Sequence, residues 1–229
     1  MNKSRLYIHI GTHKTGSTAI QHFLRQNDVL LRTKGFFCLQ GLKEFKTLIT
    51  SKEVNNKIIT RCKKELESRV KQTKQKNTDQ CFILSREGFS GNPLIGYKNA
   101  GIVAKRLSQI TTNFDVYIIV YLRRQDGFVE SMYTQQIHEG ESYTFQSFLY
   151  SLPAFSFNWK HLLTCYSEYF GKENIIVRQY DKFFLPEPDS LLVDFCQILG
   201  IDIQNTAFHD ESSKPNRGYS IDALEIAHL

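Results

Sequence analysis

The hydrophobic positions along the chain predict strands that alternate with helices. Short apolar runs typical of buried strands occur at residues 6–10, 35–39, 81–84, 116–122 and 175–177. The other apolar residues recur at helical spacing, which predicts a helix from residue 17 and further helices over residues 58–70, 102–110, 124–138, 145–152, 159–170 and 191–199. We therefore predict an α/β protein of three layers, with a mostly parallel central sheet flanked by helices.

Polar segments directly follow four of the predicted strands. They cover residues 11–18, 85–87, 123–131 and 178–180. Parallel sheets of this class bind ligands at the carboxyl ends of their strands, near the point where the strand order reverses. The functional residues are therefore expected in these segments.

The first of these segments has the properties of a phosphate-binding loop. Gly11 and Gly16 bound a polar loop that leads into a helix, whose unpaired N–H groups and dipole attract an anion. Ser17 and Thr18 add hydroxyl donors. A nucleoside triphosphate P-loop would continue with lysine after Gly16, but the lysine of this loop is Lys14. We predict a phosphate site with its cation over the loop; the alternative is a plain turn with an incidental lysine.

The second segment offers a guanidinium and a hydroxyl to a ligand. Arg123 directly follows the predicted strand 116–122, and Ser131 lies eight residues later, about two turns into a helix. If both face one cleft, they can share a phosphate, which the guanidinium binds through two hydrogen bonds. An arginine at a strand end is also commonly a surface ion pair. The pair indicates a phosphate site because it is the second such motif in the chain, after the predicted phosphate-binding loop.

Together, these motifs resemble those of the sulfotransferases that use 3'-phosphoadenosine 5'-phosphosulfate (PAPS). Residues 8–21 are similar to the 5'-phosphosulfate loop in the form common in bacterial members, and residues 121–133 are similar to the 3'-phosphate motif. Weaker similarity extends through residues 178–180 and 194–200. The resemblance implies a P-loop nucleotide-hydrolase-like sulfotransferase fold, PAPS as the co-substrate and 3'-phosphoadenosine 5'-phosphate (PAP) as the product.

The resemblance also implies which residues bind the nucleotide. They come from both motifs and from a C-terminal segment that often closes the site: Lys14, Thr15, Gly16, Ser17, Thr18, Arg123, Ser131, Asn216 and Arg217. Three positions depart from the usual pattern. His13 stands where proline is frequent, Ser17 where threonine is common, and Gly218 where serine is frequent.

The chemistry of sulfuryl transfer assigns two catalytic roles. Negative charge builds on the oxygen that bridges phosphorus and sulfur, so a fixed cation and N–H donors accelerate the reaction; Lys14 and the amides of residues 15–18 supply them without a metal. Glu87 follows the third predicted strand and is our candidate base for the acceptor hydroxyl, with a pKa raised by partial desolvation. Its alternative is a structural ion pair with Arg86 or with an arginine of a loop. His9, inside a strand, is typical of a core histidine.

Other candidate contacts remain open at this stage. His13 can contact the acceptor or the cofactor and is left unassigned. Aromatic residues border the expected acceptor cleft, although aromatic residues at such positions are more often part of a core. We expect residues 134–153 to form a lid. The analogy with bacterial members favours a sugar hydroxyl as the acceptor.

Composition limits the remaining choices. The 229 residues are 41% hydrophobic and 23% charged, which is ordinary for a soluble globular protein, and we expect one domain spanning residues 1–229 with a basic helical excursion at about 42–78. The N-terminus lacks the apolar region of a cleavable signal and no apolar run spans a membrane, so a cytoplasmic protein without membrane insertion is expected. Five cysteines without paired spacing predict reduced, mostly buried thiols, and the histidines form no cluster, so we expect no metal.

The positive charge of the chain leaves two competing interpretations. The net charge is +6, which suggests an anionic ligand, substrate or surface, although the basic run at residues 61–76 is typical of a solvated helix face. A P-loop kinase or other nucleotide-binding enzyme would need a lysine directly after Gly16 and an acidic magnesium ligand at a strand end, and both are missing. A non-catalytic binder of polyanions or nucleic acid is the other alternative. We expect no nucleic-acid partner and make no prediction of the oligomeric state.

Overall fold

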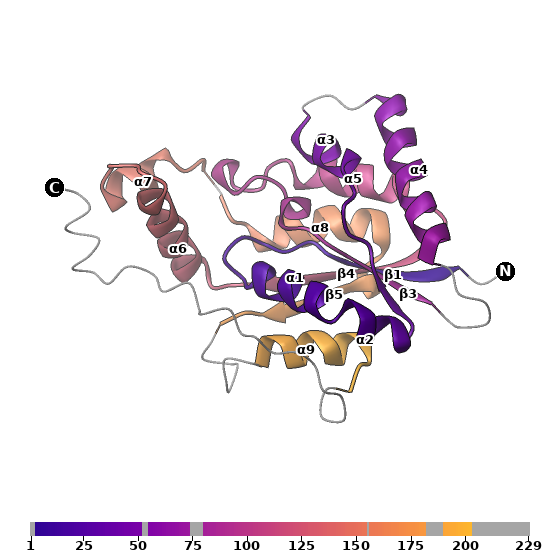
Figure 1. The fold of residues 1–229 in the computed structure, drawn as a ribbon. Coiled ribbons are helices and arrows are strands. Elements are labelled where there is room, and N and C mark those ends of the chain that lie inside the picture. The colour runs from indigo at the N-terminus through magenta and orange to yellow at the C-terminus, as the bar shows by residue number, and fades with distance from the viewer. Residues whose placement is uncertain (1–2, 52–54, 74–79, 155, 182–189, 203–229) are drawn as a thin grey trace.

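The computed structural model describes residues 3–51, 55–73, 80–154, 156–181 and 190–202. In these ranges the strands form one parallel sheet in the order β2-β3-β1-β4-β5 (Figure 1). The strands are β1 (Ser4–His9), β2 (Phe36–Cys38), β3 (Cys81–Ser85), β4 (Phe114–Leu122) and β5 (Ile175–Gln179). The predicted α/β class and the five predicted strands are confirmed, with each strand within two residues of its expected position.

Helices cover both faces of the sheet (Figure 1). One face carries α1 (Ser17–Gln26), α2 (Asp28–Thr33) and α9 (Ser190–Leu199). The other carries α3 (Glu44–Thr50), α4 (Asn56–Thr73), α5 (Ala100–Ile110) and α8 (Trp159–Phe170). Figure 1 shows α6 (Gln125–His138) and α7 (Phe145–Ser151) beyond the carboxyl ends of the strands. Three short 3₁₀ helices complete the described elements: η1 (Glu87–Ser90), η2 (Pro93–Ile95) and η3 (Lys172–Asn174).

The alternation of side chains along β1 separates two hydrophobic cores. Leu6 and Ile8 are fully buried on the side of α4, α5 and α8, whereas Tyr7 packs on the side of α1 and α9. Residues 118–121 of β4 are all fully buried, which is the pattern of a central strand covered on both faces. The sheet is thereby a rigid base for the loops at its carboxyl edge.

Several short elements differ from the prediction. Helices α2 and α3 and the turns η1 and η2 have no counterpart in the predicted pattern, which gave one helix between residues 42 and 78 and a loop over residues 88–98. Helix α3 buries only Phe45 and Leu48, too few positions to establish a helical period. Helix α4 has the expected stripe, with Cys62, Leu66 and Val70 buried. In the described ranges, no helix is long and apolar enough to cross a membrane.

Candidate functional site

The strand order reverses between β1 and β4. These strands are neighbours, paired from Ser4 with Phe114 to His9 with Ile119, while the chain continues from β1 toward β2 and β3 on one side and from β4 toward β5 on the other. Sheets of this class bind ligands in the crevice at such a reversal. The Gly11–Gly16 loop leaves β1 here and Arg123 leaves β4 here. The fold thus brings the two predicted motifs to one place.

The loop after β1 has an unusual backbone. Gly11, Lys14 and Gly16 have φ angles of 41°, 59° and 72°, all in the left-handed region. Lys14 is not a glycine, so this conformation costs on the order of 1 kcal/mol and is kept only where the surroundings impose it. A side chain at Gly16 would clash with Cδ2 of Leu191. The loop is therefore a constrained structure that presents Lys14 at a strained position.

Hydroxyl groups hold the loop to the neighbouring strand. Thr12 Oγ1 donates to the carbonyl of Tyr121 at 2.6 Å, and Thr15 Oγ1 donates to the carbonyl of Thr12 at 2.6 Å. Ser17 Oγ donates to the same Thr12 carbonyl at 3.4 Å. Thr15 and Ser17 are buried, whereas Thr18 is exposed. The hydroxyl groups of Thr15 and Ser17 thus serve the loop itself, and their backbone amides are what they can offer to a ligand.

The N-terminus of α1 completes this loop. Gly16 is the N-cap residue, no side chain caps the helix, and the first turn contains no acidic residue. The N–H groups of the first turn and the positive end of the helix dipole are then available to an anion. This is the arrangement that the sequence predicts for residues 16–18.

The turn after β3 is fastened to the end of β1. Arg86 N donates to the carbonyl of His9, Ser90 N donates to the carbonyl of Ile10, and Ser90 Oγ donates to the carbonyl of Gly11, each at 3.1 Å. Glu87 opens this turn and is half-buried. These bonds place Glu87 beside the loop that carries Lys14.

The electrostatics of Glu87 agree with its predicted role as a base. Burial raises the pKa of the Glu87 carboxyl, and the positive charge of Lys14 lowers it, so the two groups interact. Arg86 donates instead to the carbonyl of Leu42 at 3.3 Å, and in the described ranges Glu87 forms no ion pair. The structural pairing of Glu87 with Arg86 is therefore not present.

Tyr97 contacts the loop at His13, a contact that the sequence gives no means to predict. The Tyr97 hydroxyl accepts from His13 N at 3.1 Å and lies 3.1 Å from Nδ1 of the same residue, although the two residues are 84 positions apart. Burial and the charge of Lys14 lower the pKa of His13 to about 4. His13 is thus a neutral side chain next to the predicted catalytic lysine.

Arg123 lies two residues before α6, and Ser131 lies within this helix. A methyl group added at Gly127 would lie 3.2 Å from Nε of Arg123, so the guanidinium passes over this glycine. Gly127 and Ser131 are one helical turn apart, and residues at this spacing are neighbours on the helix surface. The Arg123 main chain is fixed as well, because Trp159 Nε1 donates to its carbonyl at 2.9 Å. The guanidinium of Arg123 therefore lies one helical turn before Ser131, and a phosphate shared by the two residues stays a prediction.

Tyr180 lies between the two motifs. Its ring atom Cε2 lies 3.1 Å from the position of a side chain at Gly16, and its N–H donates to the carbonyl of Leu122 at 2.7 Å. Burial raises the pKa of Tyr180 and the charge of Arg123 lowers it. Tyr180 therefore lies next to both the loop after β1 and the segment after β4. The sequence indicates only that this residue follows a strand.

Two further polar residues of the strand ends have structural roles. Arg178 forms an ion pair with Asp194 at 3.0 Å, and Asp194 also accepts from the Tyr121 hydroxyl at 2.6 Å. His9 is fully buried, its Nδ1 lies 2.8 Å from Ser85 Oγ, and burial lowers its pKa to about 3. His9 is thus a core histidine, as the sequence predicts, but its Nε2 is buried without a hydrogen-bond partner among the described residues.

Two of the predicted nucleotide-binding residues come from the C-terminal segment. Asn216 and Arg217 lie outside the described residues.

Within the described ranges, no three or more His, Cys, Asp or Glu side chains are grouped so that they could hold a metal ion. Four of the five cysteines are buried and all five are free thiols.

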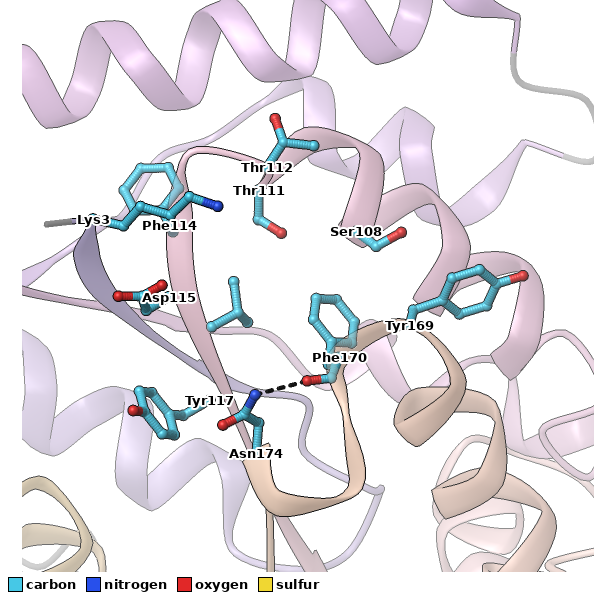
Figure 2. A pocket seen from close by; sticks show the side chains of 11 residues that line it. Lys3, Ser108, Thr111, Thr112, Phe114, Asp115, Tyr117, Tyr169, Phe170 and Asn174 are labelled. Atoms are coloured by element: carbon cyan, nitrogen blue, oxygen red, sulfur yellow. Dashed lines mark hydrogen bonds between the residues drawn. The ribbon is translucent and has the colours of Figure 1, made fainter. Parts of the chain in front are cut away.

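Two cavities lie at opposite ends of the strands. One, of about 310 Å³, lies where β1, β4 and β5 begin and is lined by residues such as Lys3, Asp115 and Asn174, whose Nδ2 donates to the carbonyl of Phe170 at 2.8 Å (Figure 2). It is remote from the candidate site at the carboxyl edge. The other, of about 590 Å³, lies between α6 and α7 and is lined by Gln125, Asp126, Val129, Glu130, Phe145, Leu149, Leu152, Ser156 and Phe157.

Comparisons with known proteins address the fold. No family model matches the chain. An uncharacterized protein of Archaeoglobus fulgidus is 31% identical over 99 residues, which are 43% of this chain and 26% of that protein, so the match spans about a quarter of its length. The sulfotransferase domain from the curacin biosynthetic pathway has a TM-score of 0.45 and 13% identity, covering 100% of this chain and 83% of that chain.

The crystal structure of a sulfotransferase from Alicyclobacillus acidocaldarius gives the informative match. Its TM-score with this chain is 0.52, with 12% sequence identity, and the match covers 91% of this chain and 86% of that chain. At this identity the likeness concerns the fold. The chain therefore has the P-loop-like α/β fold of a sulfotransferase, as its two motifs predict.

Proposed function

We propose that the protein transfers a sulfuryl group from PAPS to a hydroxyl group of an acceptor. The observation that carries this proposal is the meeting of two anion-directed motifs at the reversal between β1 and β4, with Glu87 beside Lys14. PAPS carries a phosphosulfate at one end and a separate 3'-phosphate at the other. The two motifs match this distribution of negative charge.

The donor is bound from both sides in this proposal. The amides of residues 15–18 and the open N-terminus of α1 bind the 5'-phosphate. Arg123 and Ser131 bind the 3'-phosphate. Tyr180, which lies next to both Gly16 and Arg123, separates the two phosphate subsites. The resemblance also assigns Asn216 and Arg217, which lie outside the described residues, to nucleotide binding.

The transfer is an in-line displacement at sulfur. The acceptor hydroxyl gives its proton to the Glu87 carboxylate, and its oxygen forms a bond to sulfur while the bond from sulfur to the bridging oxygen breaks. The electron pair of that bond remains on the oxygen, which leaves as part of PAP. Lys14 stabilises this developing charge, as a preorganised cation does at a leaving group. Burial makes Glu87 a stronger base than an exposed glutamate, and the charge of Lys14 keeps it ionised.

The cavity between α6 and α7 is the proposed acceptor site. Its lining residues include Gln125, which lies two residues after Arg123 in the chain. Phe145, Leu149 and Leu152 of the lining belong to residues 134–153, the predicted lid. Phe145 and Phe157 offer aromatic surfaces, while Asp126 and Glu130 accept hydrogen bonds. Pockets that combine apolar faces with a few placed polar groups suit small organic ligands, and hydroxyl-rich sugars use both kinds of contact. We therefore propose a carbohydrate acceptor.

Calorimetry with PAP and with ATP tests the proposed donor. The wild-type protein should bind PAP without a metal, and Lys14→Ala and Arg123→Ala should each weaken PAP binding roughly 10- to 100-fold, because each removes a hydrogen bond to a charged group. Arg124→Ala is the matched control: Arg124 is an exposed neighbour paired with Asp126 at 2.6 Å, and its loss should change affinity less than twofold. A preference for ATP with magnesium would overturn the proposal.

The pH dependence of transfer tests Glu87 as the base. Only the carboxylate accepts a proton, so the rate should fall as pH decreases through the pKa of Glu87, which burial raises above the usual value of a glutamate. Glu87→Gln should slow PAP formation from PAPS by a factor on the order of 10²–10⁴ while leaving PAP binding intact. Glu168, an exposed residue of α8 outside the proposed site, serves as control when it is changed to glutamine. Survival of activity in Glu87→Gln would place the base elsewhere.

A further inference from the structure

The Tyr97 hydroxyl contacts two nitrogen atoms of His13. Its oxygen accepts from the backbone N–H of His13 at 3.1 Å, and its own hydrogen can be donated either to the ring atom Nδ1, also at 3.1 Å, or to the Ser90 side chain. A neutral imidazole has one protonated and one unprotonated nitrogen. With Nδ1 accepting, the proton of His13 is on Nε2.

The protonation states of both side chains keep this arrangement. Burial raises the pKa of Tyr97 far above its usual value, and the nearby charge of Glu87 raises it further, so the hydroxyl retains its hydrogen. Burial and Lys14 lower the pKa of His13 to about 4, so the ring is neutral near pH 7. The result is a neutral N–H donor next to Lys14.

Tyr97 is itself rigidly held. Its side chain is 2% exposed and packs against Phe128, Phe157 and Trp159, with ring centroids 5.9–6.1 Å away. Its N–H donates to the carbonyl of Asn92 at 2.9 Å. A hydroxyl anchored in this way fixes the orientation of the imidazole that it contacts, as supporting residues do in preorganised sites.

The opposite ring nitrogen remains available to a ligand. His13 is only partly buried, and in the described ranges no protein group bonds to Nε2. Lys14 interacts electrostatically with both His13 and Glu87, and Glu87 interacts with Tyr97. These four residues are therefore neighbours, and they include Lys14, the group assigned to the leaving oxygen, and Glu87, the group assigned to the acceptor proton.

We propose that His13 donates a hydrogen bond from Nε2 to an oxygen of the transferring sulfuryl group, with Tyr97 as the positioning residue that sets the tautomer. This assignment rests on the proposed function. A neutral donor orients the sulfuryl group for in-line attack, and it stabilises the charge of the bound donor less than a second cation would. The role explains why a histidine held by a buried tyrosine occupies the position before the catalytic lysine.

Parallel binding of PAPS and PAP tests this role, because the two nucleotides differ only in the sulfuryl group. Calorimetry in the cold without an acceptor should show His13→Ala weakening PAPS binding roughly tenfold and PAP binding less than twofold. His13→Gln should restore most of the PAPS affinity, since its amide nitrogen can occupy the place of Nε2. His13→Asn, whose shorter amide cannot, is the matched control.

A spectroscopic measurement tests the part played by Tyr97. Nitrogen-15 NMR of histidine-labelled wild-type protein should show His13 protonated on Nε2, and Tyr97→Phe should give a mixture of tautomers with a selective loss of PAPS affinity. A wild-type His13 protonated on Nδ1 overturns the inference, as does a loss in His13→Ala that is equal for both nucleotides. Both of these outcomes are measured without a Tyr97 variant, so the test holds even if Tyr97→Phe does not fold. If neither nucleotide binds the wild type, the proposed function itself fails.

Discussion

The loop after β1 holds its shape through its own backbone and hydroxyl groups, whereas the segment after β4 is an ordinary strand-to-helix transition that carries one long side chain. In the loop, Gly11, Lys14 and Gly16 have left-handed backbones, and the Thr12 hydroxyl donates to a carbonyl of β4. After β4, Arg124 has φ −51° and ψ 138°, a relaxed conformation that leads into α6.

This difference indicates two ways of binding a phosphate. The loop offers amides and Lys14 from a backbone that is fixed before a ligand arrives, which suits the reacting end of a donor. The segment after β4 relies on the Arg123 guanidinium lying over Gly127, which suits an end that only needs to be held. Mutations in the loop should therefore affect both catalysis and binding, whereas mutations at Arg123 and α6 should affect binding alone.

Lys14→Gly should give the largest effect and separate stability from activity. Glycine adopts φ 59° without strain, so the free energy of unfolding should rise by about 1 kcal/mol in urea denaturation. PAP formation from PAPS should fall by a factor on the order of 10²–10³, because the cation at the leaving oxygen is lost. A variant that is both stabilised and fully active would remove Lys14 from the mechanism.

Gly16→Ala should destabilise the fold through the loop. Its φ of 72° is unfavourable for alanine, and the added methyl group would clash with Leu191, so we expect a loss of about 2–4 kcal/mol in the free energy of unfolding. Gly200→Ala is the control, because its φ is 74° with no atom nearby, and it should lose only the backbone part, about 1 kcal/mol. Equal losses would mean that the contact with Leu191 is unimportant.

Much of this site could be predicted from the sequence because its signals are local. The apolar run before Gly11 and the glycine spacing predict the loop, and the spacing of Arg123 and Ser131 predicts a shared helix face. The contacts of Tyr97 with His13 and of Tyr180 with the loop could not be predicted, since these partners lie at distant positions in the chain and periodicity carries no information on such contacts. The sequence also could not predict that the Thr15 and Ser17 hydroxyls donate to the carbonyl of Thr12, because residue type does not determine which acceptor a hydroxyl contacts.

Gly127→Ala should give the smallest effect and act on binding alone. The new methyl group would lie 3.2 Å from Arg123 Nε and displace the guanidinium, so PAP affinity should fall by roughly three- to tenfold in calorimetry. Alanine is also a better helix former, so the free energy of unfolding should stay equal or rise by up to about 1 kcal/mol. Unchanged affinity would show that Arg123 does not need the space above Gly127.

A crystal structure of the protein with PAP tests the central claim most directly. We predict the 5'-phosphate at the amides of residues 15–18 with Lys14 above it, and the 3'-phosphate between Arg123 and Ser131. PAP in the cavity at the amino ends of the strands (Figure 2), or PAP bound without contact to Arg123, would contradict the account.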